Sequence, residues 1–393
     1  MNAKVSSKMP AILFAVFIDL VGFGIIVPIL PFLIDKYDGD TFTGTALISV
    51  YSLFALVAGP VWGRMSDKFG RKPALAATFI GATASYVTLA HADSLLWLFI
   101  ARAMSGAMAG NIGIVMAAMA DMTTAKNRGR AMGYVGAAFG FGFAFGPAIG
   151  GLLGGTGDNI SIYLPGLIAA ALSFIAMILT ILFVPETNST KNDVSEPTNN
   201  QEVHWTQIFT PSTGYLIFSM FVLAAISQSI TFSITPFWAK HTLLWDSKQV
   251  GFLLMGTGLA VAFIQAFAIG PMFHKFGETT SLAFGAIVNI LGCLIIVIFP
   301  ASLTTALIGL PMIMSGLTIA FPALNSILSQ RTDKRLQGTA LGFSNGLSAG
   351  GRVFGPLLAG SLFTNYAPST PFILVALTGL IVMFWTYYES KKV

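Results

Sequence analysis

Residues 63–72 read Gly63-Arg64-Met65-Ser66-Asp67-Lys68-Phe69-Gly70-Arg71-Lys72, a short basic run between two long apolar stretches. A weaker copy occurs 207 positions later, where the chain has Gly270, Met272, Lys275, Phe276 and Gly277. A glycine-bracketed charged turn that occurs once in each half of the chain indicates a duplicated bundle of membrane helices.

The composition supports a polytopic membrane protein. The chain is 55% hydrophobic and only 9% charged, whereas a soluble domain is about 25% charged. The 41 glycines suit close helix packing in lipid. Lys4 and Lys8 precede an apolar run without a small-residue cleavage site, so we expect a first spanning helix there. The single cysteine, Cys293, excludes an internal disulfide framework and is expected to be a buried, inert thiol.

Twelve segments are long and apolar enough to span a membrane, for which about 20 residues are needed. The sequence therefore predicts an all-α integral membrane protein with twelve transmembrane helices in two pseudo-symmetric halves of six. The halves are expected at 1–184 and 211–393, joined by a polar cytoplasmic linker at 185–210. The predicted spans are 10–34, 42–64, 73–91, 94–118, 129–154, 160–184, 211–239, 249–271, 280–300, 302–328, 337–362 and 370–388.

The distribution of basic residues predicts the orientation. With the N-terminus inside, the cytoplasmic segments hold 16 of the 21 lysines and arginines, and the outer loops hold only Lys36, Lys240 and Lys248. This asymmetry predicts that both termini are cytoplasmic. The net charge of +5 is then a topology signal rather than a sign of nucleic-acid binding.

The internal repeat is clearest in the fifth and eleventh spans. A shift of 209 residues aligns 128–153 with 337–362 without a gap, and nine positions are identical, among them Gly146/Gly355 and Pro147/Pro356. The same shift aligns Asp19 with Gln228. Six helices followed by six that enter from the same side form a parallel repeat, and substrate sites of such transporters lie near the bilayer midplane between the halves.

Several motifs resemble those of the major facilitator superfamily. Residues 63–75 resemble its loop between helices two and three, and 100–106 resemble the helix-four motif with a buried arginine. The stretch 142–151 resembles the helix-five motif of proton-driven antiporters. Within the superfamily the chain is most similar to the tetracycline/proton antiporters, over 19–31, 121–151 and 322–360. Those exporters carry an acidic residue in helix nine, where this chain has Asn289, so the resemblance supports proton-coupled export and leaves open whether tetracycline is a substrate.

Three charged residues are expected deep in the apolar spans, where a lipid-facing charge costs about 2.5–3.5 kcal/mol or more. They are Asp19, Arg102 and Arg352. Asp19 is a candidate proton-coupling and substrate-contacting residue, because an apolar setting favours the neutral carboxyl and a nearby cation favours the charged one. The alternative is a static, inward-facing ion pair or a hydrogen-bonded carboxylate. The resemblance implies that Arg102 tunes this proton site. Arg352 is expected to have a gating or structural role.

The basic turn is a candidate gate at the cytoplasmic face. Gly63 and Gly70 allow close approach around Asp67 and Arg71, and Asp67 could neutralise the positive end of a facing helix. Asp121 is expected to join this network with Arg71 or Arg130. The resemblance implies a latch that holds the inside closed; the alternative is that the basic residues only fix topology.

Helix five and the expected cavity supply the remaining candidates. Small residues at short spacing let helices approach closely, so helix five is expected to form a bendable seam between the halves or to pack statically. Its candidate residues are Gly142, Gly146, Pro147 and Gly150. The cavity candidates, in addition to Asp19, are Asn111, Gln228 and Asn325.

These features predict a proton-coupled secondary antiporter that exports a small amphipathic molecule, such as a drug or secreted metabolite, by alternating access. Its expected partners are the substrate, protons and the lipid bilayer, without nucleic acid, metal or other cofactor, and it is expected to be a monomer in the inner (plasma) membrane. Two alternatives stay open: a transporter for one metabolite, such as a siderophore or sugar-like solute, and a non-transporting receptor. An enzyme is disfavoured, because the four histidines lie at helix ends or in loops and the spans contain no paired carboxylates.

Overall fold

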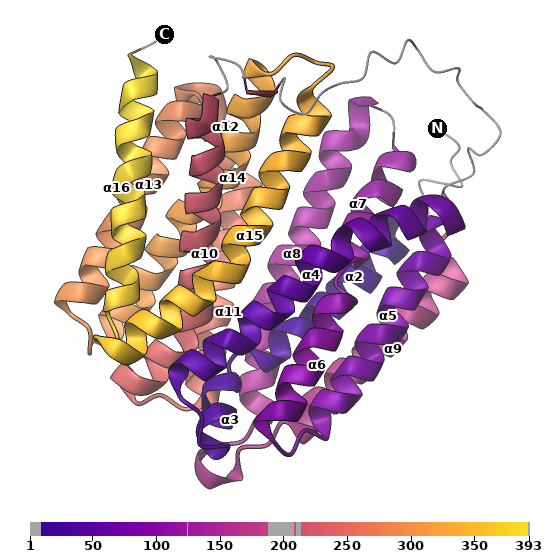
Figure 1. Cartoon of the computed structure of the whole chain (residues 1–393), viewed down its shortest axis with the longest axis vertical. Coiled ribbons are helices and arrows are strands. Elements are labelled where there is room, and N and C mark those ends of the chain that lie inside the picture. The colour runs from indigo at the N-terminus through magenta and orange to yellow at the C-terminus, as the bar shows by residue number, and fades with distance from the viewer. Residues whose placement is uncertain (1–8, 124, 188–207, 210–213, 392–393) are drawn as a thin grey trace. The chain divides into compact units, whose positions relative to one another are not determined.

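The computed structural model describes residues 9–123, 125–187, 208–209 and 214–391. These residues form helices joined by short turns, and the described part of the chain contains no strand (Figure 1). The helices separate into two compact units. Unit 1 contains the described residues up to 187 together with Leu244–Ala262, and unit 2 contains 208–209, 214–243 and 263–391.

Unit 1 is built from six membrane-length helical segments and most of α11 (Ser247–Phe263). Two of these segments are interrupted, so that α2 is followed by the short α3 and α6 by α7. The helices of unit 1 are α2 (Met9–Ile26), α3 (Leu30–Lys36), α4 (Thr41–Phe69), α5 (Arg71–Ala90), α6 (Leu95–Ala107), α7 (Asn111–Asp121), α8 (Ala125–Leu153), the 3₁₀ turn η1 (Gly157–Asn159) and α9 (Tyr163–Phe183).

Unit 2 contains the second set of long helices. Two of them include a π-helical turn, which adds one residue to a helical turn. The elements of unit 2 are α10 (Gly214–Leu243), the π turn η3 (Ile264–Ala268), α12 (Ile269–Phe276), α13 (Glu278–Ile298), the π turn η4 (Thr305–Gly309), α14 (Leu310–Arg331), α15 (Gln337–Asn365) and α16 (Thr370–Ser390).

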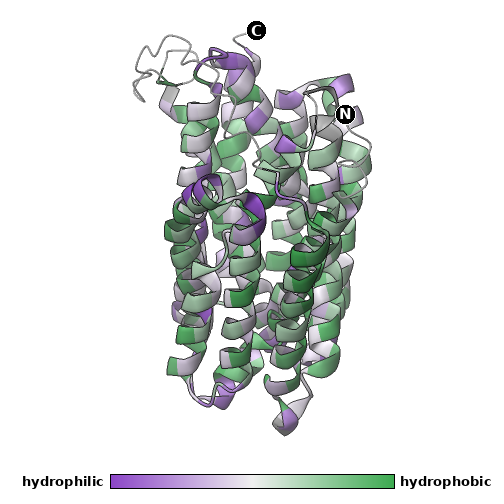
Figure 2. Ribbon diagram, turned by 90° about the vertical axis from the view of Figure 1, so that its right-hand side faces the viewer, coloured by the Kyte–Doolittle hydropathy of each residue, from purple (hydrophilic) through white to green (hydrophobic). Residues whose placement is uncertain are grey.

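All twelve predicted spans coincide with helices. Among the described residues, eleven helices meet both the length and the hydropathy expected of a membrane span. The twelfth predicted span, 337–362, is α15, which has 29 residues but is rich in glycine and serine and contains Arg352. Figure 2 shows that hydrophobic residues cover most of the helical length and that hydrophilic residues are more common toward the helix ends.

Helix breaks in unit 1 follow from local chemistry. The predicted span 10–34 is interrupted at Val27–Ile29, because Pro28 lacks an N–H and its ring clashes with the carbonyl one turn earlier. The predicted span 94–118 is interrupted at Met108–Gly110, which frees the carbonyl of Ala107. The indole Nε1 of Trp62 donates a hydrogen bond to this carbonyl at 2.7 Å. The break places Asn111 at the first position of α7.

The first turn of α4 is fixed by an N-cap. Asp40 accepts hydrogen bonds from the Thr43 hydroxyl at 2.6 Å and from the Thr43 backbone N–H at 2.8 Å. These bonds, the hydroxyl first, hold the pKa of Asp40 below its usual value. An N-cap of this kind satisfies a backbone donor that the helix leaves unpaired.

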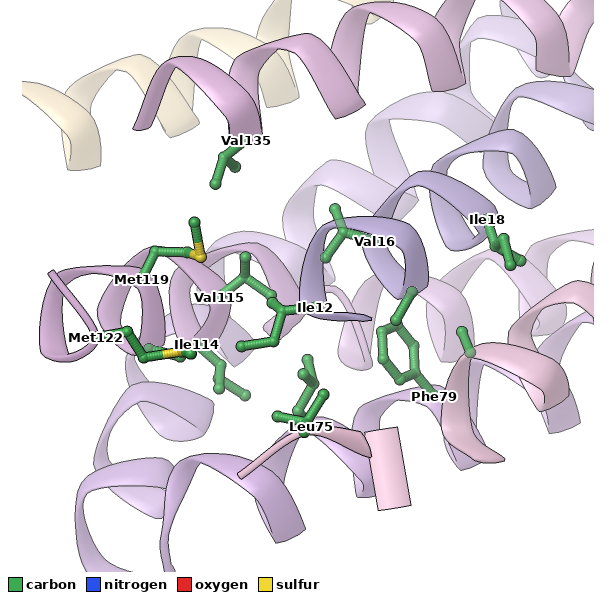
Figure 3. Close-up of a cluster of buried hydrophobic side chains, with 14 of the residues drawn as sticks. Ile12, Val16, Ile18, Leu75, Phe79, Ile114, Val115, Met119, Met122 and Val135 are labelled. Carbon is green, nitrogen blue, oxygen red and sulfur yellow. The ribbon is translucent and has the colours of Figure 1, made fainter. Parts of the chain in front are cut away.

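The interior of unit 1 is an apolar cluster between α2, α5, α7 and α8. Figure 3 shows Ile12 and Val16 of α2 facing Leu75 and Phe79 of α5, with Val115 of α7 beside them. Unit 2 has a second cluster, centred on α10, α13 and α14. Because each cluster consists of fully or nearly fully buried side chains, each unit has a hydrophobic core of its own.

Glycines of α8 allow close contact with two other helices of unit 1. A Cβ added at Gly150 would lie only 1.8 Å from the carbonyl oxygen of Ile25 in α2. On another face, a Cβ added at Gly251 of α11 would lie 2.5 Å from the carbonyl oxygen of Pro147. Close packing against α8 explains why most of α11 belongs to unit 1, although the duplication places this helix in the second half of the chain. The half boundaries at 184 and 211 stay a prediction.

Candidate functional site

Asp19 lies at the centre of a polar cluster in unit 1. It is in the middle of α2, and only 7% of its surface is exposed. The residues around it in α2 are apolar, so the carboxyl group depends on polar groups from other helices. Two such groups reach it, one from α7 and one from α9.

Both neighbours of Asp19 donate hydrogen bonds to it. The Asn111 amide Nδ2 donates to Oδ2 at 2.5 Å, and the Ser173 hydroxyl donates to Oδ1 at 2.8 Å. Asn111 and Ser173 are themselves buried. The Oδ1 of Asn111 accepts a hydrogen bond from the backbone N–H of Ile112 at 2.8 Å, which fixes the direction of the amide. The cluster therefore presents one hydrogen-bonding group to each carboxyl oxygen of Asp19.

The hydrogen bonds from Ser173 and Asn111 respond differently to a proton on the Asp19 carboxyl group. A hydroxyl group can donate or accept, whereas an amide N–H can only donate. A proton on Oδ1 of Asp19 can be accommodated if the Ser173 hydroxyl rotates and accepts it. A proton on Oδ2 would instead face the N–H of Asn111. The geometry therefore favours Oδ1 as the oxygen that takes up a proton.

Arg102 is buried close to the same face of α2. Only 2% of its surface is exposed, and its guanidinium carbon lies 5.8 Å from the ring centroid of Phe23. Phe23 is one helical turn after Asp19, on the same face of α2. The Nε and Nη1 atoms of Arg102 have no hydrogen-bond partner among the described residues. A buried guanidinium with two available donors can receive an acceptor group or stabilise a nearby negative charge.

The predicted latch residues come together at one end of unit 1. Arg71 Nη1 forms an ion pair with Asp67 Oδ1 at 2.6 Å, and Arg71 Nε forms another with Asp121 Oδ2 at 3.2 Å. Arg71 Nη1 also donates to the Ser66 hydroxyl at 2.7 Å. Between α4 and α5, Gly70 has a φ of +108°, a conformation that favours glycine. The turn thus holds α4, α5 and α7 together through one arginine.

Glu186 is a member of this network that sequence reasoning assigned to the linker. Its Oε1 accepts a hydrogen bond from the backbone N–H of Arg71 at 2.8 Å, and its Oε2 accepts one from the N–H of Lys72 at 3.2 Å. These are unpaired donors at the start of α5, where a negative charge also interacts favourably with the helix dipole. Residues 188–207 and 210–213 of the predicted linker lie outside the described residues.

The Glu186 contact predicts a measurable effect on stability. Replacing the carboxylate in Glu186→Gln removes the charge and one of the two acceptors, so the free energy of unfolding is expected to fall by about 0.3–1 kcal/mol, less at high salt. Thermal unfolding of the purified protein at low and high salt measures this change. Asp38→Asn removes a comparable exposed charge away from α5 and is the control. An equal response of both variants would contradict the capping role.

The helix-five glycines predicted to form a seam between the halves contact α2 within unit 1. Cβ atoms added at Gly142, Gly146 and Gly150 would lie 2.5, 2.6 and 1.8 Å from atoms of Leu20, Val21 and Ile25, respectively. Pro147 is buried in the same stretch. These glycines therefore position α2, and with it Asp19, against α8.

The remaining predicted site residues are not part of the Asp19 cluster. Gln228 of α10 and Asn325 of α14 are half-buried in unit 2. Arg352 lies in the middle of α15, as expected; its side chain is exposed, and its backbone carbonyl accepts a hydrogen bond from the Ser229 hydroxyl at 3.2 Å. Gly63 has open space where a Cβ would be. The side chain of Arg130 lies outside the described residues.

Comparison with known proteins identifies the class. The model of the Major Facilitator Superfamily matches residues 12–349 and 217–393, so the chain belongs to this superfamily. It has the twelve-helix fold of that family and is a multi-pass membrane protein of a transporter family rather than an enzyme family.

Particular relatives include drug-resistance proteins. The chain is 28% identical to the class H tetracycline resistance protein of Pasteurella multocida, over 97% of this chain and 96% of that protein. It is 26% identical to multidrug resistance protein 1 of Bacillus subtilis (strain 168), over 95% and 94% of the two chains. A crystal structure of the nucleoside transporter NupG (D323A mutant) has the same fold, with a TM-score of 0.77, 15% identity and coverage of 97% and 99%.

Proposed function

We propose that this protein is a proton-driven antiporter that exports small amphipathic molecules, including drugs. The observation that carries the proposal is the buried carboxyl group of Asp19, which two neutral donors hold and which has a proton-accepting oxygen next to a rotatable hydroxyl. A buried ionisable residue in a membrane span is a functional-site candidate. The similarity to tetracycline and multidrug resistance proteins supports a drug-like substrate.

The proposed cycle couples the charge of Asp19 to the conformation. When Asp19 is deprotonated, it accepts both hydrogen bonds and ties α2 to α7 and α9. When Oδ1 is protonated, the Ser173 hydroxyl reverses, and the carboxyl no longer carries a charge that must be solvated. Arg102, over Phe23, provides the positive charge that favours release of the proton. Substrate and proton alternate at this site, and the latch around Arg71 stabilises one of the two conformations.

The proposed location and assembly follow from the same features. The protein is proposed to act as a monomer in the inner (plasma) membrane of a bacterium, with both termini in the cytoplasm, and to use the proton gradient without a cofactor. Tetracycline is not proposed as its main substrate. The part of α13 that follows Glu278 carries no charged residue, and Asn289 lies at its centre.

Substrate-dependent proton movement in proteoliposomes tests the proposal. The purified protein is reconstituted with a pH-sensitive dye inside the vesicles, an outwardly directed substrate gradient is imposed, and a panel of tetracycline, lipophilic cations and neutral drugs is compared. Proton uptake with at least one amphipathic compound is expected. Proton movement with only a sugar or a siderophore would indicate a dedicated metabolite transporter. Binding without any counterflow would indicate a receptor.

A further inference from the structure

A small pocket in unit 2 is independent of the Asp19 cluster. It lies between α10, α13, α14 and α16, and small residues such as Ala224, Gly316 and Gly379 form part of its wall. Three polar side chains also line it: Ser227, Asn289 and Thr378. All three are at least nine-tenths buried. Buried polar groups in a membrane protein need partners, so the hydrogen bonds of these three residues identify what the pocket can bind.

Asn289 provides an unused acceptor. Only 1% of its surface is exposed, and its Oδ1 has no hydrogen-bond partner among the described residues. Its Nδ2 lies 3.5 Å from the carbonyl oxygen of Ile313, at the limit of a hydrogen bond. A Cβ added at Gly379 would lie 2.9 Å from Oδ1, so the glycine leaves open space in front of this oxygen.

The two hydroxyl groups have nearby acceptors for their own hydrogens, so their oxygens are the groups available toward the pocket. Ser227 Oγ lies 2.8 Å from the carbonyl oxygen of Leu223, Thr378 Oγ1 lies 2.7 Å from that of Val375, and the two hydroxyl oxygens are 2.6 Å apart. Each hydroxyl has a single hydrogen. Only two hydrogens are available for these three contacts, so none is left for a further partner while the contacts are kept.

The pocket is thus lined by acceptors, and a neutral donor is the complementary occupant. The cavity has a volume of about 20 Å³, and about 10–15 Å³ is enough to hold one water molecule. No lining residue is charged, so a buried cation would have no counter-charge and would be costly. A water molecule has two hydrogens, which match the two kinds of acceptor that line the pocket, the Asn289 Oδ1 and the hydroxyl oxygens.

We propose that this pocket is a specific site for one water molecule, which joins α13 to the hydroxyl pair of α10 and α16. Unit 1 contains a comparable junction between helices, although the repeat aligns Asp19 with Gln228 rather than with Ser227. In unit 1, Asp19 and Ser173 join the first and last spans of the first half, and in unit 2, Ser227 and Thr378 join the first and last spans of the second half. The junction in unit 1 contains the carboxyl group of Asp19. The junction in unit 2 contains only neutral groups and, in this proposal, a water molecule.

Two threonines of α16 provide a matched test. Thr378 and Thr386 are both buried, and each donates to the carbonyl three residues earlier at 2.7 Å, but only Thr378 lines the pocket. Thr378→Val is expected to lower the melting temperature by about 2–4 °C more than Thr386→Val. A cryo-EM or crystal structure of the wild-type protein at about 2.5 Å or better is expected to show density within hydrogen-bond distance, about 2.6–3.2 Å, of Asn289 Oδ1.

A second variant keeps the test independent of Thr378. Gly379→Ala places a methyl group in front of Asn289 Oδ1 and is expected to remove the density, whereas Gly346→Ala, which has open space at its Cβ, is expected to leave it. Equal melting temperatures for the two threonine variants and a wild-type map without density would overturn the proposal. A melting temperature that rises in NaCl relative to KCl and choline chloride at equal ionic strength would also overturn it, because the occupant would then be Na⁺.

Discussion

Replacing Asp19 with asparagine is expected to abolish proton-driven accumulation of substrate while leaving the protein folded. Each pH unit across the membrane supplies about 1.4 kcal/mol per proton, a tenfold substrate gradient for each coupled proton. A two-unit gradient is therefore expected to give about 100-fold accumulation per coupled proton in the wild type and none in Asp19→Asn. Uptake of a substrate into inside-out vesicles with an imposed pH gradient measures this difference.

The asparagine variant is informative because it preserves shape and hydrogen bonds. Its amide oxygen can still accept from Asn111, and its amide nitrogen can donate to the Ser173 hydroxyl, so the packing of α2, α7 and α9 is kept. Counterflow, in which labelled and unlabelled substrate exchange without a pH gradient, is expected to continue. Asp40→Asn is the matched control, because asparagine also caps a helix and Asp40 lies outside the spans. Wild-type accumulation by Asp19→Asn would show that another group carries the proton.

The sequence was sufficient to predict the parts of the fold that depend on composition and repetition. The length and hydropathy of the spans predict the helices, and the repeat around Gly146 and Gly355 predicts the duplication. Asp19 could be singled out because a charge inside an apolar span is costly and rare. The contact of Asp121 with Arg71 could also be predicted from the charges around the basic turn, and this ion pair measures 3.2 Å.

The partners of these residues could not be predicted, because they are distant in sequence and ordinary in type. Ser173 is 154 positions from Asp19, and nothing in its local sequence distinguishes it from other serines in the spans. Glu186 lies in a polar stretch that gives no sign of the Arg71 and Lys72 backbone N–H groups it caps. Periodicity likewise cannot show that α11 packs on α8, because this contact depends on which glycines face each other. The Ser173 contact, the Glu186 cap and the α8–α11 packing all depend on tertiary contacts that local sequence does not show.

The contact between α2 and α8 is expected to make Gly150 one of the residues least tolerant of substitution. A Cβ at Gly150 would lie 1.8 Å from the backbone oxygen of Ile25, and a backbone atom cannot move without shifting α2. Gly150→Ala is therefore expected to cost about 1–3 kcal/mol or more through overpacking. Thermal unfolding of the purified variant in detergent, compared with the wild type, measures this cost.

Gly136 of the same helix supplies a control with the opposite expected sign. A Cβ there meets nothing within 4 Å, and alanine is favoured over glycine in a helix by about 0.8–1.0 kcal/mol, so Gly136→Ala is expected to stabilise the protein slightly. Because α8 positions α2, Gly150→Ala is also expected to reduce proton-driven transport in the fraction that remains folded. Equal melting temperatures for Gly150→Ala and Gly136→Ala would contradict the close contact between α2 and α8. In that case α8 would not be the element that positions Asp19.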